Sequence, residues 1–192
     1  MVATDMAAQT LLDATRAILP LIRDTIDEGE QGRRLPDRVA RAMADAGVAV
    51  TVLPATDLFL MGREHQHHVP RGVAPAHRLL THGVTCSLAT NNVLNPFTPF
   101  GDCSLIRMAN LYANVLQLDR PAELCECFGM LTDRSARLLN LKDYGFAVGN
   151  PADVVIIGAQ APEQAIAEIS QPLAVFKRGR PTVVWHPPAR GH

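Results

Sequence analysis

The densest group of potential metal ligands in the sequence is His65-Gln66-His67-His68. A His-x-His pair at the end of a strand is a common metal-binding arrangement, because neutral imidazoles bind Zn²⁺ and similar ions. Here the flanking segments 61–64 and 69–72 are polar and contain turn residues, which predicts a loop. Two imidazoles on a loop without a third ligand nearby seldom make a specific site. We therefore expect these histidines to be exposed, and we assign no metal ligand.

The four cysteines also carry potential chemistry, and they are Cys86, Cys103, Cys125 and Cys127. Cys125 and Cys127 lie on a predicted helix, where two residues of separation place side chains about 200° apart around the axis. This pair therefore cannot bind one ion. The first residues show no basic segment followed by an apolar core, so we expect no secretory leader, a cytoplasmic protein and reduced cysteines.

Composition excludes several classes of protein. The 192 residues contain 18 Lys+Arg and 19 Asp+Glu, and the net charge of −1 argues against nucleic-acid or polybasic membrane-surface binding. A hydrophobic content of 47% with 19% charged residues is typical of a globular protein. No apolar run is long enough to span a membrane, and no G-x-G-x-x-G loop is present. A complete eight-stranded α/β barrel needs about 250 residues, more than this length allows.

The elements that would position any site follow from the hydrophobic period. Residues 6–46 have a helical pattern, with a charged break at 27–34 and a helix end expected at Gly47. Two short β-branched runs, Val48–Leu53 and Val84–Ala89, predict buried parallel strands. A loop over 54–72 and a helix over Ala74–His82 separate them. Helix, glycine and strand in repetition is typical of an α/β protein.

The remainder predicts a loop, three helices and three strands. The loop covers 90–102, and Asp102 is expected to cap the next helix, whose apolar face includes Met108 and Tyr112. Further helices are predicted over Pro121–Met130 and Thr132–Leu139. After a turn-rich connector, strands are predicted over Asp153–Gly158, Leu173–Lys177 and Thr182–Trp185, with a hairpin at 178–181.

Several of these segments resemble the closing part of amidohydrolase-superfamily enzymes, and their middle resembles the cytosine deaminase branch. The resemblance covers about residues 47–190, with the motifs in the family's order. They are Arg134–Leu141, Gly145, Gly149–Ile157 and Val175–Val183 for the superfamily, and Leu53–Arg63, Arg71–Val73 and Asn91–Gly101 for the cytosine deaminase branch.

The resemblance implies an α/β fold that is the C-terminal portion of a (β/α)8 metal-dependent hydrolase barrel plus strands of a small β-sandwich. Residues 1–46 would be a helical segment, 47–142 a partial barrel with its last two strands, and 143–192 a partial sandwich. Residues 10–47 also resemble, more weakly, the first helices of acyl-CoA-dehydrogenase-like flavoproteins, which leaves a junction open within 30–47.

In the family a divalent metal, Zn or Fe, lowers the pKa of a bound water, and the hydroxide attacks the ring carbon that carries an amine. The resemblance places Asn91 at the position of the family's Asp ligand and base, and Asn92 and Phe97 near the substrate. An amide cannot take up a proton as a carboxylate does. The family's histidine ligands and catalytic Glu belong to strands that this chain lacks, so we expect no metal to bind this chain alone.

The resulting expectation is a cytosine deaminase-like amidohydrolase that would act on a pyrimidine-like nitrogen heterocycle but is inactive as this chain. A homo-oligomer or a partner chain could supply the missing half of the barrel. A non-catalytic interaction protein and half of a split enzyme stay open as alternatives, and neither nucleic acid nor membrane is expected as a partner. The sequence does not identify the substrate.

Overall fold

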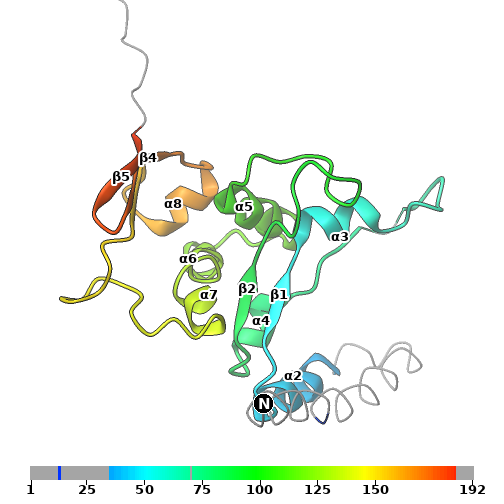
Figure 1. Cartoon of the computed structure of the whole chain (residues 1–192). Coiled ribbons are helices and arrows are strands. Elements are labelled where there is room, and N and C mark those ends of the chain that lie inside the picture. Colours follow the sequence, from blue (N-terminus) through cyan, green and yellow to red (C-terminus); the bar gives the residue numbers. More distant parts are fainter. Residues whose placement is uncertain (1–12, 14–34, 70, 185–192) are drawn as a thin grey trace, which may run out of the picture. The chain divides into compact units, whose positions relative to one another are not determined.

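The computed structural model describes Asp13 and residues 35–69 and 71–184 (Figure 1). The helical pattern expected before residue 35 therefore lies almost wholly outside the described residues, as does Trp185. The chain divides into two compact units, one of Met1–Val52 with Ala74–Ser87 and one of Leu53–Val73 with Leu88–His192. Within the described residues, no helix is both long and apolar enough to cross a bilayer.

The first unit contains the helices α2 (Leu35–Asp45) and α4 (Ala76–Leu80), the strand β1 (Val50–Val52) and the first two residues of β2 (Cys86–Leu88). The strands β1 and β2 form a two-stranded sheet. The two strands run side by side in the same direction (Figure 1). The backbone N–H of Val50 donates to the carbonyl of Thr85 at 2.9 Å, and the hydroxyls of Thr51 and Ser87 lie 2.8 Å apart. All three residues of β2 are buried, as expected for a strand covered on both faces.

Glycine ends the helix that precedes each strand. Gly47 follows α2 with a φ of +66°, and Gly83 follows α4 with a φ of +85°. The backbone N–H groups of Gly47 and Val48 donate to Ala44 and Met43, which satisfies carbonyls that the helix end would otherwise leave open. These positions confirm the helix–glycine–strand pattern read from the sequence.

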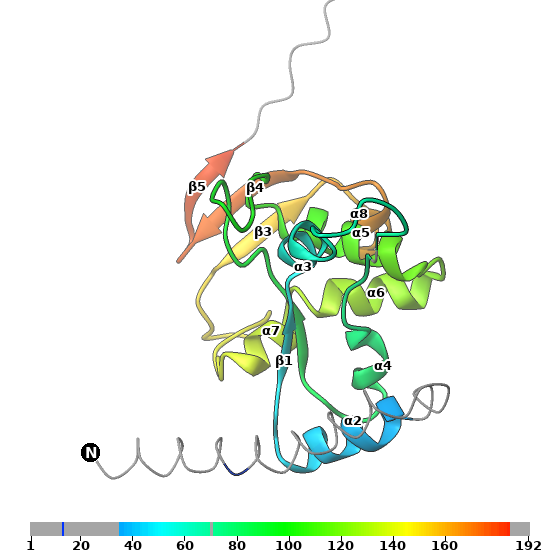
Figure 2. The ribbon, with the colours of Figure 1, turned by 90° about the vertical axis from the view of Figure 1, so that its right-hand side faces the viewer.

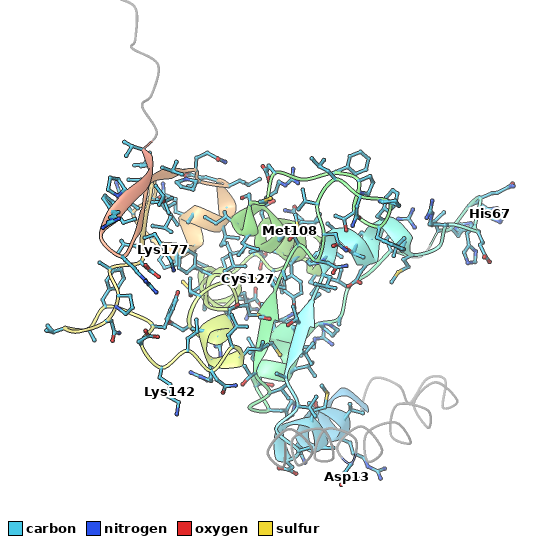
Figure 3. The ribbon with its side chains drawn as sticks, viewed as in Figure 1. Asp13, His67, Met108, Cys127, Lys142 and Lys177 are labelled. Atoms are coloured by element: carbon cyan, nitrogen blue, oxygen red, sulfur yellow. The ribbon has the colours of Figure 1, made fainter. Side chains whose placement is uncertain are left out.

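The second unit is mainly helical around one core. Its helices are α3 (Pro54–Leu60), α5 (Leu105–Leu116), α6 (Pro121–Gly129), α7 (Asp133–Leu138) and α8 (Pro162–Ala167). The core residues Met108, Tyr112, Cys127, Met130 and Ile166 are buried, and Figure 3 shows Met108 and Cys127 in the interior among these helices. The side-chain amide of Asn110 on α5 donates to the carbonyl of Ile166 on α8 at 2.9 Å, which joins the two helices.

A three-stranded antiparallel sheet completes this unit (Figure 2). Its strands are β3 (Val154–Ile157), β4 (Pro172–Lys177) and β5 (Arg180–Val184), in that order. Val155, Val175 and Val183 lie opposite one another across the three strands, and Ile156, Ala174 and Val184 form the next row. Neighbouring rows point to opposite faces of a sheet, so both faces carry apolar side chains. Val155, Ile156, Val183 and Val184 are each about half exposed.

The structure corrects two expectations and adds one helix. Residues 54–60 form α3 instead of a loop, because Pro54 occupies the first helical turn, where its missing N–H costs nothing. Ser104, rather than Asp102, caps α5: its hydroxyl accepts from the N–H of Arg107 at 3.2 Å, while Asp102 accepts from the N–H of Ser104 at 3.0 Å. Helix α8 was not expected.

Replacing Gly47 with Ala tests the helix end. A Cβ at Gly47 meets no atom within 4 Å, so the cost comes from the positive φ alone and is about 1 kcal/mol. We expect the Tm of Gly47→Ala to fall by about 2–4 °C in circular dichroism melts. Gly72→Ala is the matched control, because Gly72 also has open space but no positive φ, and its Tm should stay the same or rise slightly. Equal losses in both variants would contradict this account.

Candidate functional site

The segments that follow β1 and β2 belong to the same compact unit and are joined by two contacts. Helix α3 follows β1, and the loop from Ala89 to Cys103 follows β2. The hydroxyls of Thr56 on α3 and Thr98 on the loop lie 2.5 Å apart and are buried. The rings of Phe59 and Phe100 meet edge to face, with centroids 6.2 Å apart and an interplanar angle of 84°. Helix α3 therefore forms the support on which this loop rests.

Asn95–Thr98, which we call the Phe97 turn, is the most regular part of the loop. The N–H of Asn95 donates to the carbonyl of Thr98 at 3.1 Å, and the N–H of Thr98 donates to the carbonyl of Asn95 at 3.2 Å. The side chain of Asn95 accepts from the N–H groups of both Phe97 and Thr98. Pro96 adds a fixed φ at the first corner. The ring of Phe97 stands at the tip of this closed turn, 57% exposed.

Asn91 and Asn92 lie on the same loop, nearer to β2, and both side chains are exposed. Asn91 has a φ of +63°, a left-handed conformation that Asn tolerates better than most residues. The structure thus brings all three predicted site residues, Asn91, Asn92 and Phe97, onto one loop. Their roles in binding or catalysis stay predictions.

Charged groups surround α3. Partial burial raises the pKa of the Asp57 carboxyl above its ordinary value, and a backbone hydrogen bond from Leu53 opposes that rise. The guanidinium of Arg63 lies over the ring of Phe59, 5.1 Å from its centroid, in a cation–π contact. Arg71 donates to the carbonyl of Met61 at 2.5 Å, which closes the loop that carries the histidines.

The described residues do not bring together the side chains that a metal centre needs. Residues 35–69 and 71–184 contain no group of three or more His, Cys, Asp or Glu side chains that could hold an ion. His65, His67 and His68 are exposed, and Figure 3 shows His67 at the tip of a loop that extends away from α3. Asn91 carries an amide, which is a weaker metal ligand than a carboxylate and cannot accept a proton.

The arrangement is suited to binding rather than to proton transfer. An exposed aromatic ring on a rigid turn can stack on a flat heterocycle, and nearby amides can donate to and accept from its polar edge. The sequence pattern predicts Phe97 as a site residue, which stays a prediction, and it does not indicate the Thr56–Thr98 pair or Asp57. The pair spans 42 residues, so no local pattern reveals it. Asp57 could have been noticed as a carboxylate shortly after a predicted strand.

The sequence model of the amidohydrolase family matches residues 3–183. The match begins well before residue 47, so the similarity extends over the segment 10–47 that also resembles flavoproteins.

Relatives and solved structures agree with this match. The chain is 29% identical over 154 residues to a pterin deaminase of Rhizobium rhizogenes, with 77% of this chain and 35% of that protein covered. It is 32% identical over 107 residues to an N-isopropylammelide isopropyl amidohydrolase of Pseudomonas sp., and this match covers 55% of this chain and 27% of that protein. The crystal structure of a 5-methylcytosine deaminase from Klebsiella pneumoniae liganded with 5-fluorocytosine superposes with a TM-score of 0.74 at 24% identity, over 81% of this chain and 38% of that chain. The chain therefore spans about a third of the length of its relatives.

Two of the four cysteines, Cys125 and Cys127, lie on helix α6. Cys127 on α6 is buried, and burial, aided by the negative charges of Glu123 and Glu126, raises the pKa of its thiol to about 12. Cys125 donates to the carboxylate of Glu163 at 3.2 Å, and this hydrogen bond raises the pKa of the Cys125 thiol. Cys103 is exposed. The thiols of Cys127 and Cys125 are therefore protonated near neutral pH, and we interpret both as structural.

Alkylation with iodoacetamide should distinguish these thiols. A pKa of about 12 leaves about one Cys127 thiol in ten thousand ionised at pH 8, and the thiolate is the reactive form. We expect peptide mass spectrometry of the native protein to find Cys103 labelled and Cys127 unlabelled. Residual labelling of Cys127 should rise about tenfold with each pH unit up to its pKa. Labelling of Cys127 as fast as Cys103 at pH 8 would contradict the buried thiol.

Proposed function

Because the chain belongs to the amidohydrolase family, we propose that it is the C-terminal portion of an enzyme that hydrolyses a C–N bond of a small nitrogen heterocycle and releases ammonia. The relatives named above act on heterocycles, and one is a deaminase of pterin. A pyrimidine-like ring is the proposed substrate, supported by the resemblance of residues 91–101 to the cytosine deaminase branch.

In this proposal β1 and β2 are the seventh and eighth strands of a (β/α)8 barrel, and β3–β5 are part of the adjoining β-sandwich. Residues 47–142 then form the partial barrel and 143–192 the partial sandwich. Sites of such barrels lie where the strands end at their carboxyl side, and the loop with Asn91, Asn92 and Phe97 follows β2 directly. This place in the chain supports the proposed roles of the candidate residues.

Each candidate residue has a distinct role. Phe97 stacks on the ring of the substrate, and the amide of Asn92 hydrogen-bonds its polar edge. In hydrolytic deamination water adds to the ring carbon that bears the amine, and the amine leaves as ammonia after it gains a proton. Asn91 can orient a group by hydrogen bonding but cannot take or return that proton. Two observations support the proposed inactivity of these 192 residues: position 91 carries an amide, and the described residues contain no cluster of metal ligands.

Metal analysis and an ammonia assay on the purified chain test the proposed inactivity. We expect substoichiometric Zn and Fe and no ammonia from cytosine or pterin above background. Asn91→Asp should not raise the metal content, because one carboxylate supplies only one of the ligands that a catalytic site needs. Stoichiometric metal together with ammonia release would overturn the proposed inactivity.

Ring binding is the second arm of the test and does not depend on catalysis. Ligand-detected NMR should show cytosine or pterin bound to the wild-type chain, and Phe97→Ala should weaken binding about tenfold, since base–aromatic stacking is worth about 1–3 kcal/mol. Phe146→Ala is the matched control, because Phe146 is 95% exposed and lies outside the loop. Absence of ring binding to the wild type would refute the proposed function.

A non-catalytic interaction protein, or one half of a split enzyme, is the second candidate. The three-stranded sheet favours it, because exposed apolar side chains on both faces of a sheet promote association. The strand edges of a partial barrel would also promote association, because their unpaired backbone groups can pair with another chain.

Size-exclusion chromatography tests this second candidate. We expect the wild-type chain to elute as an oligomer, and Val155→Lys with Val183→Lys to shift it toward the monomer by placing two charges on one face of the sheet. Gln160→Lys with Gln171→Lys adds the same charge at exposed polar positions and should leave elution unchanged. A wild-type monomer at all concentrations would exclude association through this sheet.

A further inference from the structure

The Phe97 turn is held at two points on one face of α3. Thr56 and Phe59 are three residues apart, so their side chains lie on the same side of the helix. Thr56 meets Thr98, the last residue of the turn, and Phe59 meets Phe100, two residues later. The contacts leave the ring of Phe97 outside the packed region. The turn therefore has one buried end and one exposed tip.

The hydroxyl pair is the more directional of the two contacts. The exposed fraction is 7% for Thr56 and 2% for Thr98, and their oxygens are 2.5 Å apart. A hydrogen bond constrains both the distance and the angle between its partners, whereas an edge-to-face ring pair tolerates a range of positions. A buried hydroxyl that loses its partner is costly, so this pair resists separation.

The backbone of the loop after β2 has several positive φ angles, which contacts with neighbouring residues must stabilise. Asn91 and Leu94 have φ values of +63° and +57°, and Gly101 has +140°. Left-handed backbone is disfavoured for a residue such as Leu94, and such conformations persist only where surrounding contacts impose them. The contacts with α3 therefore add restraint to the hydrogen bonds that close the Phe97 turn locally.

We propose that the Thr56–Thr98 hydrogen bond is a positioning latch, which fixes the Phe97 turn on α3 and so presents the ring of Phe97 pre-organised for an uncharged, flat heterocycle. The ligand class in this statement rests on the proposed function. A turn that is already ordered loses less conformational freedom when a ring stacks on it, and binding is stronger for that reason. Thr56 and Thr98 are positioning residues, since they act on the ligand only through Phe97.

Hydrogen exchange in the full chain tests the latch without any ligand. The N–H groups of Phe97 and Thr98 report on the turn because both donate to Asn95. In Thr98→Val, which keeps the shape but loses the hydroxyl, we expect both amides to exchange at least about tenfold faster, relative to amides of α6. Thr98→Ser retains a hydroxyl and should restore slow exchange. Thr132→Val is the matched control, because it removes another half-buried hydroxyl, bonded to the carbonyl of Phe128.

A double variant separates the latch from a loss of stability. Thr56→Val with Thr98→Val leaves no unpaired hydroxyl, so its melting temperature should return close to that of the wild type. Exchange at Phe97 and Thr98 should nevertheless stay fast. If exchange is slow in the double variant, or changes less than twofold in Thr98→Val, the turn is held by packing and the latch is wrong.

Titration with cytosine and pterin completes the test. We expect Thr98→Val to weaken ring binding about tenfold and Thr98→Ser to leave it near the wild-type value. Unchanged binding in Thr98→Val, with faster exchange, would refute the link between the latch and the ring. If the wild type binds neither ring, the proposed function fails, and the exchange data still decide whether the hydroxyl pair holds the turn.

Discussion

The proposed shape of the candidate site depends chiefly on one buried contact, between the hydroxyls of Thr56 and Thr98, which lies beside the ring pair of Phe59 and Phe100. Loss of one partner would leave a buried donor or acceptor unsatisfied, at a cost of about 1–3 kcal/mol, which is a substantial part of the stability of a typical domain. Helix α3 matters for this reason: it is only seven residues long, yet it offers the loop after β2 a hydroxyl and a ring on one face. Its two contacts reach the loop at Thr98 and Phe100.

Binding and catalysis make different demands on side chains, and the proposed role of the Phe97 turn concerns the first. Stacking needs a rigid, exposed ring, and the Phe97 turn supplies one. Proton transfer and metal binding need carboxylates and imidazoles that converge, and within residues 35–69 and 71–184 no such group forms. The chain spans about a third of the length of its relatives.

Short-range patterns predicted much of this fold. The strands β1 and β2, their preceding glycines, and helices α6 and α7 follow from hydrophobic period and turn residues within a few positions. The prediction failed at α3, because Pro54 was interpreted as the end of a strand and not also as the first turn of a helix. It failed at the cap of α5, where Asp102 and Ser104 are both good capping residues two positions apart. The Thr56–Thr98 contact could not be predicted, since it depends on how distant segments pack.

The two prolines of the loop have an evolutionary consequence. Pro96 and Pro99 flank Phe97 and Thr98, so the backbone there is restricted before any ligand arrives. The side chain at position 97 contributes little to the packed interior, because it stands at the exposed tip. Residue 97 can therefore change its size or polarity while the turn keeps its shape. Such a position lets a protein family explore new ligands by single substitutions at low structural cost.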